Sequence, residues 1–281
     1  MDETKIKEKL DEERGINSAI FCTMDSLYST IILNSLSNEE YRKIKLIILS
    51  NRYGGRHGSF LNQLFHNFHR SGLNFVIYLS YVFVIHKVLC FFSGRFLTIR
   101  QLALSKKIPI LETADVNSEL LTTQLIKLAP DLIVSCYFDQ LFKKSLYSIP
   151  RFGTINIHPG PLPNYRGPFP TFWLLSRGEK SSAVTVHRVD DRFDTGDILY
   201  LENVSLPNLP TVLGADRIIL FKIPVIIKKL LNNEINLSGN VQEPHKARYY
   251  SFPRKNDIRN ARRTNLKLFN LKDLVYFTRK K

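Results

Sequence analysis

Short apolar runs alternate with helix-like segments along most of this chain, and this alternation limits the folds that it can adopt. Residues 18–24, 44–51 and 131–138 are nearly continuous apolar runs. Runs of this kind are typical of strands that are buried on both faces, as in parallel sheets. Because helix-like segments lie between them, the pattern predicts right-handed βαβ units. The predicted fold class is therefore α/β, a Rossmann-like parallel-rich sheet flanked by helices.

The remaining elements follow from periodicity and from turn residues. Pro224 lies inside an otherwise helical run at 212–231 and is expected to kink or split it. Further strands are expected at 108–113, 153–158, 182–189 and 197–206, and helices at 25–37, 60–104, 118–130, 140–150 and 169–179, with a glycine-rich loop at 52–59.

The chain divides into a large domain and a shorter extension. Residues 1–206 carry the strand–helix alternation, interrupted by an apolar helical insertion at about 52–104. Residues 207–281 are expected to form a helical, basic C-terminal extension. Its last part, 254–281, holds ten Lys or Arg against two Asp. A solvated basic face and an anion-binding surface are both compatible with this composition.

Net charge and cysteine content indicate which kinds of partner and which cellular compartment are expected. The net charge of +15 favours anionic partners. The cysteines, Cys22, Cys90 and Cys136, have neither disulfide nor metal-ligand spacing, so we expect a reducing, cytoplasmic setting and no metal. The charged N-terminus lacks the apolar core of a signal peptide. The apolar segment 73–92 is interrupted by His86 and Lys87, so a packed helix is favoured over membrane contact, with surface contact left open.

Several common catalytic and nucleotide-binding motifs are missing from the sequence. It has no G-x-S-x-G, G-x-x-x-x-G-K-[ST], C-x-x-C or H-E-x-x-H, and the glycines of "GGRHGS" do not have dinucleotide-binding spacing. These absences disfavour the corresponding hydrolase, phosphate-loop, redox and zinc-protease classes.

One strand end carries a candidate site. In "GTINIHPGPLPNYRGPFP", Asn156 and His158 are two residues apart, so they project from the same face of a strand. The carboxyl ends of parallel strands form the binding crevice of an open α/β sheet. A carboxylate from the loop at 190–197 is expected to orient His158 and to stabilise its protonated form. With the Asn156 amide, this set suits acyl transfer to an amine without a covalent nucleophile.

The region "INIHPGPLPNYRGPFPTFWLLSRGEKSSAVTVHRVDDRFDTGDIL" resembles the hallmark region of 10-formyltetrahydrofolate-dependent formyltransferases. The family's N-x-H and proline-rich element match Asn156, His158 and "PLPNYRGPFP". Its catalytic aspartate, 36 residues beyond the histidine in D-x-G, matches Asp194 with Gly196. The likeness extends more loosely from Ser18 to Leu206.

The resemblance implies a formyltransferase fold and 10-formyltetrahydrofolate as co-substrate, with no metal. It implies that Asn156 and protonated His158 stabilise an oxyanion, while Asp194 holds the histidine and assists proton movement. Thr185 and His187 would support this site from one strand face, and Arg166 would be structural or orient the substrate. The residues implied to line the pterin pocket, largely through their backbone, are Phe138, Asp139, Gln140, Leu141, Asp190, Asp191 and Arg192.

The sequence does not identify the acceptor. The resemblance implies a primary amine on aminoacyl-tRNA or on an amino-sugar nucleotide, with a methionyl-tRNA-formyltransferase-like catalytic domain. Gly160 replaces the family's more usual serine, and "TMDSLYS" lacks the phosphate-binding glycines of the ribonucleotide enzyme. About 75 residues follow Leu206 and look helical, unlike the family's second, barrel-type domain. Two further functions stay open, a 10-formyltetrahydrofolate hydrolase and a non-catalytic domain that binds folate or RNA.

Overall fold

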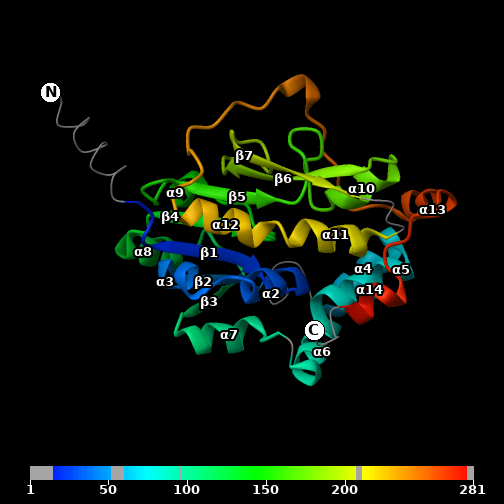
Figure 1. The fold of residues 1–281 in the computed structure, drawn as a ribbon, viewed down its shortest axis with the longest axis horizontal. Coiled ribbons are helices and arrows are strands. Elements are labelled where there is room, and N and C mark those ends of the chain that lie inside the picture. The colour runs from blue at the N-terminus through cyan, green and yellow to red at the C-terminus, as the bar shows by residue number, and fades with distance from the viewer. Residues whose placement is uncertain (1–14, 52–59, 95, 207–210, 277–281) are drawn as a thin grey trace.

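The computed structural model describes residues 15–51, 60–94, 96–206 and 211–276. The charged N-terminus, the glycine-rich loop at 52–59 and the end of the basic segment lie outside the described residues. Within them, a seven-stranded sheet runs across the centre of the molecule (Figure 1).

The sheet has the strand order β3-β2-β1-β4-β5-β6-β7. The first five strands are parallel, and the last two add to the edge in antiparallel pairing. This confirms the predicted Rossmann-like, parallel-rich fold. The strands are β1 (Ala19–Met24), β2 (Ile44–Ser50), β3 (Ile110–Thr113), β4 (Leu132–Cys136), β5 (Thr154–His158), β6 (Ser181–Arg188) and β7 (Ile198–Ser205).

Helices cover both faces of the sheet because successive strand residues point to opposite sides. On β1, Phe21 packs into the larger core cluster, whereas Ile20 and Cys22 pack into a second cluster on the other face. Helices α2 (Leu27–Asn34), α11 (Val212–Leu220) and α12 (Ile223–Leu231) cover the first face; α8 (Glu119–Leu128) and α9 (Lys144–Tyr147) cover the second.

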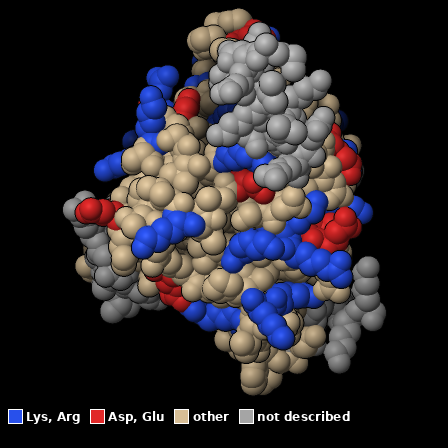
Figure 2. All heavy atoms as spheres, turned by 90° about the vertical axis from the view of Figure 1, so that its left-hand side faces the viewer, with Lys and Arg blue, Asp and Glu red and all other residues tan. Residues whose placement is uncertain are grey.

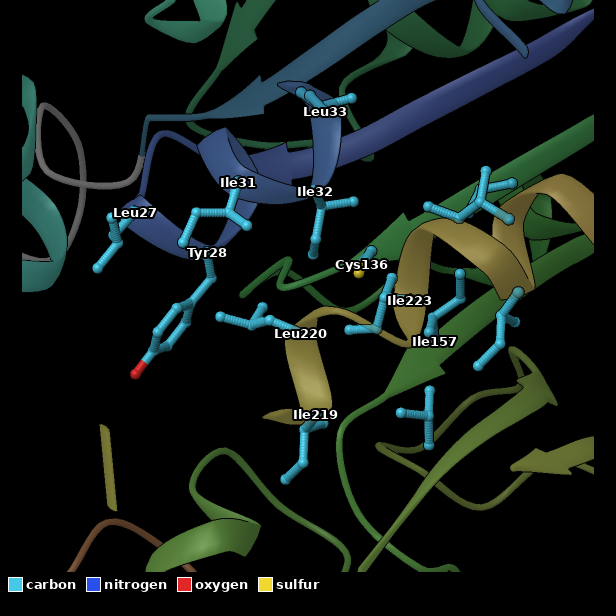
Figure 3. Packing of buried hydrophobic residues seen from close by; sticks show 14 of the residues in the cluster. Leu27, Tyr28, Ile31, Ile32, Leu33, Cys136, Ile157, Ile219, Leu220 and Ile223 are labelled. Carbon is cyan, nitrogen blue, oxygen red and sulfur yellow. The ribbon is translucent and has the colours of Figure 1, made fainter. Parts of the chain in front are cut away.

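The close packing of α2 and α11 on the first face is visible in Figure 3. Ile31 and Ile32 of α2 and Leu220 of α11 belong to one core cluster, which also includes Cys136 and Ile157 of the sheet. Residues 211–231 therefore belong to the same core as the strands. The domain boundary predicted at residue 206 remains a prediction, and it does not coincide with a gap in this core.

Most expected helices are present, with two differences. The run at 212–231 is split, as predicted, with Pro224 in the first turn of α12. The helix expected over 140–150 is wrong except for the single turn α9, because the Gln140 side chain is bound to Val116 N, Ser50 Oγ and Thr113 O. Helix α3 (Asn38–Lys43), closed by a Ser37–Glu40 capping box, was not expected.

The insertion folds into a series of helices rather than one. Gly72, at φ +84°, separates α4 (Phe60–Ser71) from α5 (Leu73–Ser80), which runs through the π-helical turn η2 (Tyr81–Ile85) into α6 (His86–Ser93). The other helices are α7 (Ile99–Lys106), α10 (Pro170–Ser176), η3 (Pro244–Lys246), α13 (Lys255–Arg263) and α14 (Leu271–Tyr276).

A buried polar cluster ties the insertion to the sheet. The hydroxyls of Tyr28 and Tyr78 contact each other and donate to Asp216 Oδ2 at 2.6 and 3.0 Å. Burial raises the pKa of Asp216, although hydrogen bonds from Tyr28, Thr171 and Tyr78 act in the opposite direction. The cluster joins α2, α5 and α11, and so fixes α5 relative to the strands.

We expect Tyr78→Phe to lower the free energy of unfolding by about 1–3 kcal/mol, because it removes a hydrogen bond from a buried carboxyl group. Chemical denaturation measures this change. Tyr200→Phe is the matched control, since that hydroxyl contacts Glu202 and Lys229 near the surface. Equal losses in the two variants would show that the buried cluster is not what holds α5.

Candidate active site

The site is assembled by the pairing of β5 with β6. Strand β5 carries Asn156 and His158, and its antiparallel register places His187 of β6 directly opposite Asn156. The loop that follows β6 returns Asp194 to the same place. The three predicted catalytic residues are therefore brought together, with His187 beside them.

One carboxylate oxygen, Oδ1 of Asp194, lies at the centre of the group. It is 3.4 Å from Asn156 Nδ2, 3.5 Å from His158 Nδ1 and 3.5 Å from His187 Nε2. The other oxygen, Oδ2, accepts a hydrogen bond from the Gly167 backbone N–H at 2.8 Å. Asp194 thus joins both strands to the proline-rich loop after β5.

The two histidines have different tautomers fixed by backbone carbonyls. His158 donates from Nε2 to Tyr165 O at 2.8 Å, so its Nδ1 faces Asp194. His187 donates from Nδ1 to Arg188 O at 2.7 Å, so its Nε2 accepts from Asn156 Nδ2 at 3.1 Å. His187 orients the Asn156 amide, a supporting role of the kind expected from the alternation along β6.

The protonation of His158 differs from the expectation. Burial lowers the pKa of His158, and this outweighs the opposing effect of the nearby Asp194 charge. The imidazole is 4% exposed, and this burial favours its neutral form. Protonation of His158 would require its Nδ1 to take up a proton, because Nε2 already carries the hydrogen donated to Tyr165 O.

Asp194 itself is ionised. Burial alone raises the pKa of its carboxyl group, but its electrostatic contacts with the His158 and His187 rings and the hydrogen bond from the Gly167 N–H together hold that pKa well below its usual range. The site therefore keeps a fixed negative charge beside a neutral imidazole. This charge stabilises the imidazolium that forms when His158 accepts a proton.

Two glycines permit the close approach of the loops. A Cβ atom on Gly196 would lie 2.1 Å from Arg188 O, so the D-x-G turn after Asp194 needs glycine there. Gly167, at φ +111°, would place a Cβ 2.0 Å from Tyr250 O. Asp194 adopts a left-handed conformation with φ +57°.

The C-terminal segment braces the site. Gln242 donates from Nε2 to Asp194 O at 3.1 Å and to Gly196 O at 2.7 Å, and its Oε1 accepts from Arg166 Nε and a terminal guanidinium nitrogen at 3.1 and 2.6 Å. Arg166 is therefore a structural residue that acts through Gln242. Gln242 was missed by the sequence analysis, because nothing in its surroundings marks it before the fold is known.

The proline-rich turn after β5 is held from β6. Thr185 Oγ1 donates to Gly160 O at 2.7 Å and accepts from Leu162 N at 3.3 Å. A Cβ atom on Gly160 would lie 2.7 Å from Pro170 Cβ. The glycine that departs from the family pattern thus fits the tight packing of this turn.

A cavity of about 770 Å³ opens over the site. Asn156, His158, Asp194 and His187 all line it. A volume of this size suits a drug-sized or cofactor-sized ligand. The predicted folate-pocket residues that also line it are Phe138, Asp139, Gln140, Leu141 and Arg192.

Asp190 and Asp191 lie in the predicted loop, but neither is among the cavity-lining residues. Asp190 Oδ1 accepts from Thr195 Oγ1 at 2.5 Å and from Arg192 N at 3.2 Å. Asp191 Oδ1 accepts from the Tyr147 hydroxyl at 3.1 Å. Their side chains shape the loop, and their predicted role in folate binding would have to come from the backbone.

The opposite wall comes from the insertion and the C-terminal segment. Helix α4 presents a polar face to the cavity. Leu79 of α5 and Phe83 of η2 line the cavity beside it, and Tyr249 and Phe252 of the C-terminal segment complete this wall. The polar residues of α4 recur at helical spacing, although the sequence did not show that they face the site. They are Asn62, Gln63, His66, Asn67 and Arg70.

The cavity lining fits a folate in its chemistry. Phe138 stacks on Phe142 with ring centroids 5.3 Å apart, and Arg192 supplies a cation. Tyr137 also lines the cavity, while its hydroxyl is buried and makes no hydrogen bond within the described residues. Over the same residues, no group of three or more His, Cys, Asp or Glu side chains has the arrangement of a metal site.

Residues 93–211 match a family model described as Formyl transferase. Methionyl-tRNA formyltransferase of Syntrophus aciditrophicus is 40% identical over 105 residues, which cover 37% of this chain and 34% of that protein. The bifunctional polymyxin resistance protein ArnA of Wigglesworthia glossinidia brevipalpis is 32% identical over 145 residues, which cover 50% of this chain and 22% of that protein. The matched region spans about a third or less of these relatives' own length.

Solved structures show the same fold. WlaRD, a sugar 3N-formyl transferase, has a TM-score of 0.52 at 18% identity and covers 84% of this chain and 70% of its own. Phosphoribosylglycinamide formyltransferase from Streptococcus pneumoniae has a TM-score of 0.51 at 15% identity, covering 78% and 98%. The resemblance to formyl transferases around Asn156, His158 and Asp194 is confirmed by the family match over residues 93–211.

We expect His158 to titrate below the ordinary histidine value of about 6.5, with the proton of the neutral ring on Nε2. A pH titration of the imidazole nitrogens by NMR measures both properties. Asp194→Asn removes the charge that favours the imidazolium and should lower this pKa further. Titration of His158 at or above the ordinary value would contradict the neutral resting site.

Proposed function

We propose that this protein transfers a formyl group from 10-formyltetrahydrofolate to a primary amine. The observation that carries the proposal is the convergence of Asn156 and His158 on the ionised carboxylate of Asp194 at the wall of a ligand-sized cavity. The formyl transferase family match over residues 93–211 supports this reaction class.

The proposed reaction forms a C–N bond between the amine and the formyl carbon and breaks the bond from that carbon to folate nitrogen. The proton lost by the attacking amine passes to His158 Nδ1, the free ring nitrogen, and then to the leaving nitrogen. Asp194 stabilises the imidazolium between these two transfers.

Asn156 is positioned to bind the developing oxyanion. One amide hydrogen is held by His187, and the 3.4 Å contact to Asp194 is long for a hydrogen bond. The second hydrogen makes only this long contact with Asp194 Oδ1, so an oxygen that becomes negative in the transition state can compete for it. A pre-oriented donor of this kind stabilises the transition state more than the ground state.

The proposed acceptor approaches from the α4 wall and carries an anionic group. Arg70 is half-buried, donates to Asn67 Oδ1 at 2.6 Å and lies over the Phe252 ring at 4.7 Å. In the described part of the chain it makes no ion pair with a carboxylate. A held guanidinium without a counter-ion suits a phosphate, which both aminoacyl-tRNA and amino-sugar nucleotides contain.

Overall charge does not separate these two acceptors. Figure 2 shows Lys and Arg side chains spread over the face at the amino ends of the strands, away from the cavity. Part of the net charge of +15 therefore lies away from the site. The acceptor must be distinguished by experiment, through the salt dependence of its affinity.

Asn156→Ala, His158→Ala and Asp194→Asn should each lower formyl transfer by about two to four orders of magnitude, through loss of the oxyanion or acid–base group. The assay follows transfer from 10-formyltetrahydrofolate to charged initiator tRNA, to amino-sugar nucleotides and to water. Asn203→Ala, an exposed residue on β7, is the control and should keep full activity. Wild-type turnover in the three site variants would exclude this site, and transfer to water alone would make the protein a hydrolase.

Arg70→Leu should raise the KM for the acceptor by about ten- to hundredfold, the effect of losing a hydrogen bond to a charged group. The KM for 10-formyltetrahydrofolate should stay the same. Lys246→Leu removes an exposed cation and should change neither value. A rise confined to the folate KM would place the folate's own carboxylates, and not the acceptor, on Arg70.

A further inference from the structure

The insertion carries an exposed apolar stripe along one side of α5, η2 and α6. The apolar residues of this stripe recur at helical spacing, so they lie on one face of a continuous helix. The most exposed are Phe92 at 79%, Phe91 at 74% and Leu73 at 60%. The apolar stripe consists of Leu73, Ile77, Val84, Val88, Phe91 and Phe92.

The other sides of the same helix are already occupied. Phe75, Tyr78 and Val82 are buried in the core, and Leu79 and Phe83 line the catalytic cavity. Residues 73–92 are the one segment among the described residues with the length and apolar composition of a membrane-crossing helix, yet only 35% of its most apolar window is buried. The helix is therefore packed against the protein on one side, as expected, whereas the apolar stripe on its other side is exposed to solvent.

Basic residues lie beside the start of the apolar stripe. Helix α13 packs against α4, and Lys255 Nζ lies 5.1 Å from the centroid of the exposed Phe68 ring. A Cβ atom placed on Gly72, the residue before Leu73, would lie 3.6 Å from Lys255 Cγ, so the Lys255 side chain passes beside the start of α5. The exposed cations of α13 share one face by their spacing, and they are Lys255, Arg259, Arg262 and Arg263.

We propose that the apolar stripe and the basic face of α13 together bind an anionic membrane surface. A surface helix with an exposed apolar face and adjacent cations lies in the interface, with its apolar side among the acyl chains. Anionic headgroups would pair with the α13 cations, each of which adds attraction near the surface. An apolar patch of this kind, rimmed by charge, marks an interaction site in a folded protein.

The segment lies on the membrane and does not cross it. Its buried side is fixed by the hydrogen bond from Tyr78 to Asp216. His86 also lies on this side, and burial lowers its pKa to about 4, so the imidazole is uncharged where it packs against the core. Crossing would require this side to separate from the sheet. Binding along the surface needs no change in the fold.

A second copy of the chain fits the same surface less well. A symmetric dimer through the apolar stripe would bring two α13 helices toward each other. Each copy carries a net charge of +15, so like charges would oppose the contact. An anionic lipid surface complements both the apolar and the basic parts.

The test is co-sedimentation of the full chain with vesicles of phosphatidylcholine alone and of phosphatidylcholine mixed with phosphatidylglycerol. We expect binding to the anionic vesicles, and Phe91→Ser with Phe92→Ser should weaken it by at least about tenfold, given the apolar area lost from each ring. Leu120→Ser on α8, a residue 73% exposed elsewhere, is the matched control and should bind like the wild type.

The charge contribution is tested by Arg259→Glu with Arg263→Glu, which should weaken binding to the anionic vesicles about tenfold or more. Lys127→Glu on α8 is the control for general loss of positive charge. Thermal unfolding of every variant establishes that the fold is kept. Absence of wild-type binding, equal binding by the stripe variants, or a dimer that Phe91→Ser with Phe92→Ser dissociates would each overturn the proposal.

Discussion

The buried carboxylate of Asp194 is the interaction on which the rest of the site depends. A charge removed from water is costly unless it is paired and hydrogen-bonded. Here the Gly167 N–H, the Asn156 amide and two imidazoles surround it. These partners come from β5, β6 and the proline-rich loop, so the carboxylate is stable only when the antiparallel pairing and both loops are in place.

The same requirement explains why elements far apart in sequence meet at this point. Gln242 closes the Asp194 loop from the C-terminal segment, and Tyr28 and Tyr78 fix α5 through Asp216. The cavity therefore has one wall made by the sheet and its loops and a second wall made by the insertion. In the proposed function, the first wall performs the transfer and the second selects the amine.

The sequence predicted the sheet because continuous apolar runs are a local signal. The family resemblance singled out Asn156, His158 and Asp194, and the structure brings these three residues together. The sequence did not predict the neutral state of His158, since burial depends on packing from several elements. It also missed the bracing by Gln242 and the inward polar face of α4, which become visible only through long-range contacts. The helix expected at 140–150 failed because tertiary hydrogen bonds of Gln140 outweighed local propensity.

The proposed reaction transfers a formyl group to an amine without a covalent enzyme intermediate. The most direct measurement is a single turnover with 10-formyltetrahydrofolate labelled in the formyl carbon, analysed by mass spectrometry of the acceptor and of the protein. The label should appear in an amide on the acceptor and never on the protein. Label recovered only as formate, or bound covalently to the chain, would contradict the proposed reaction.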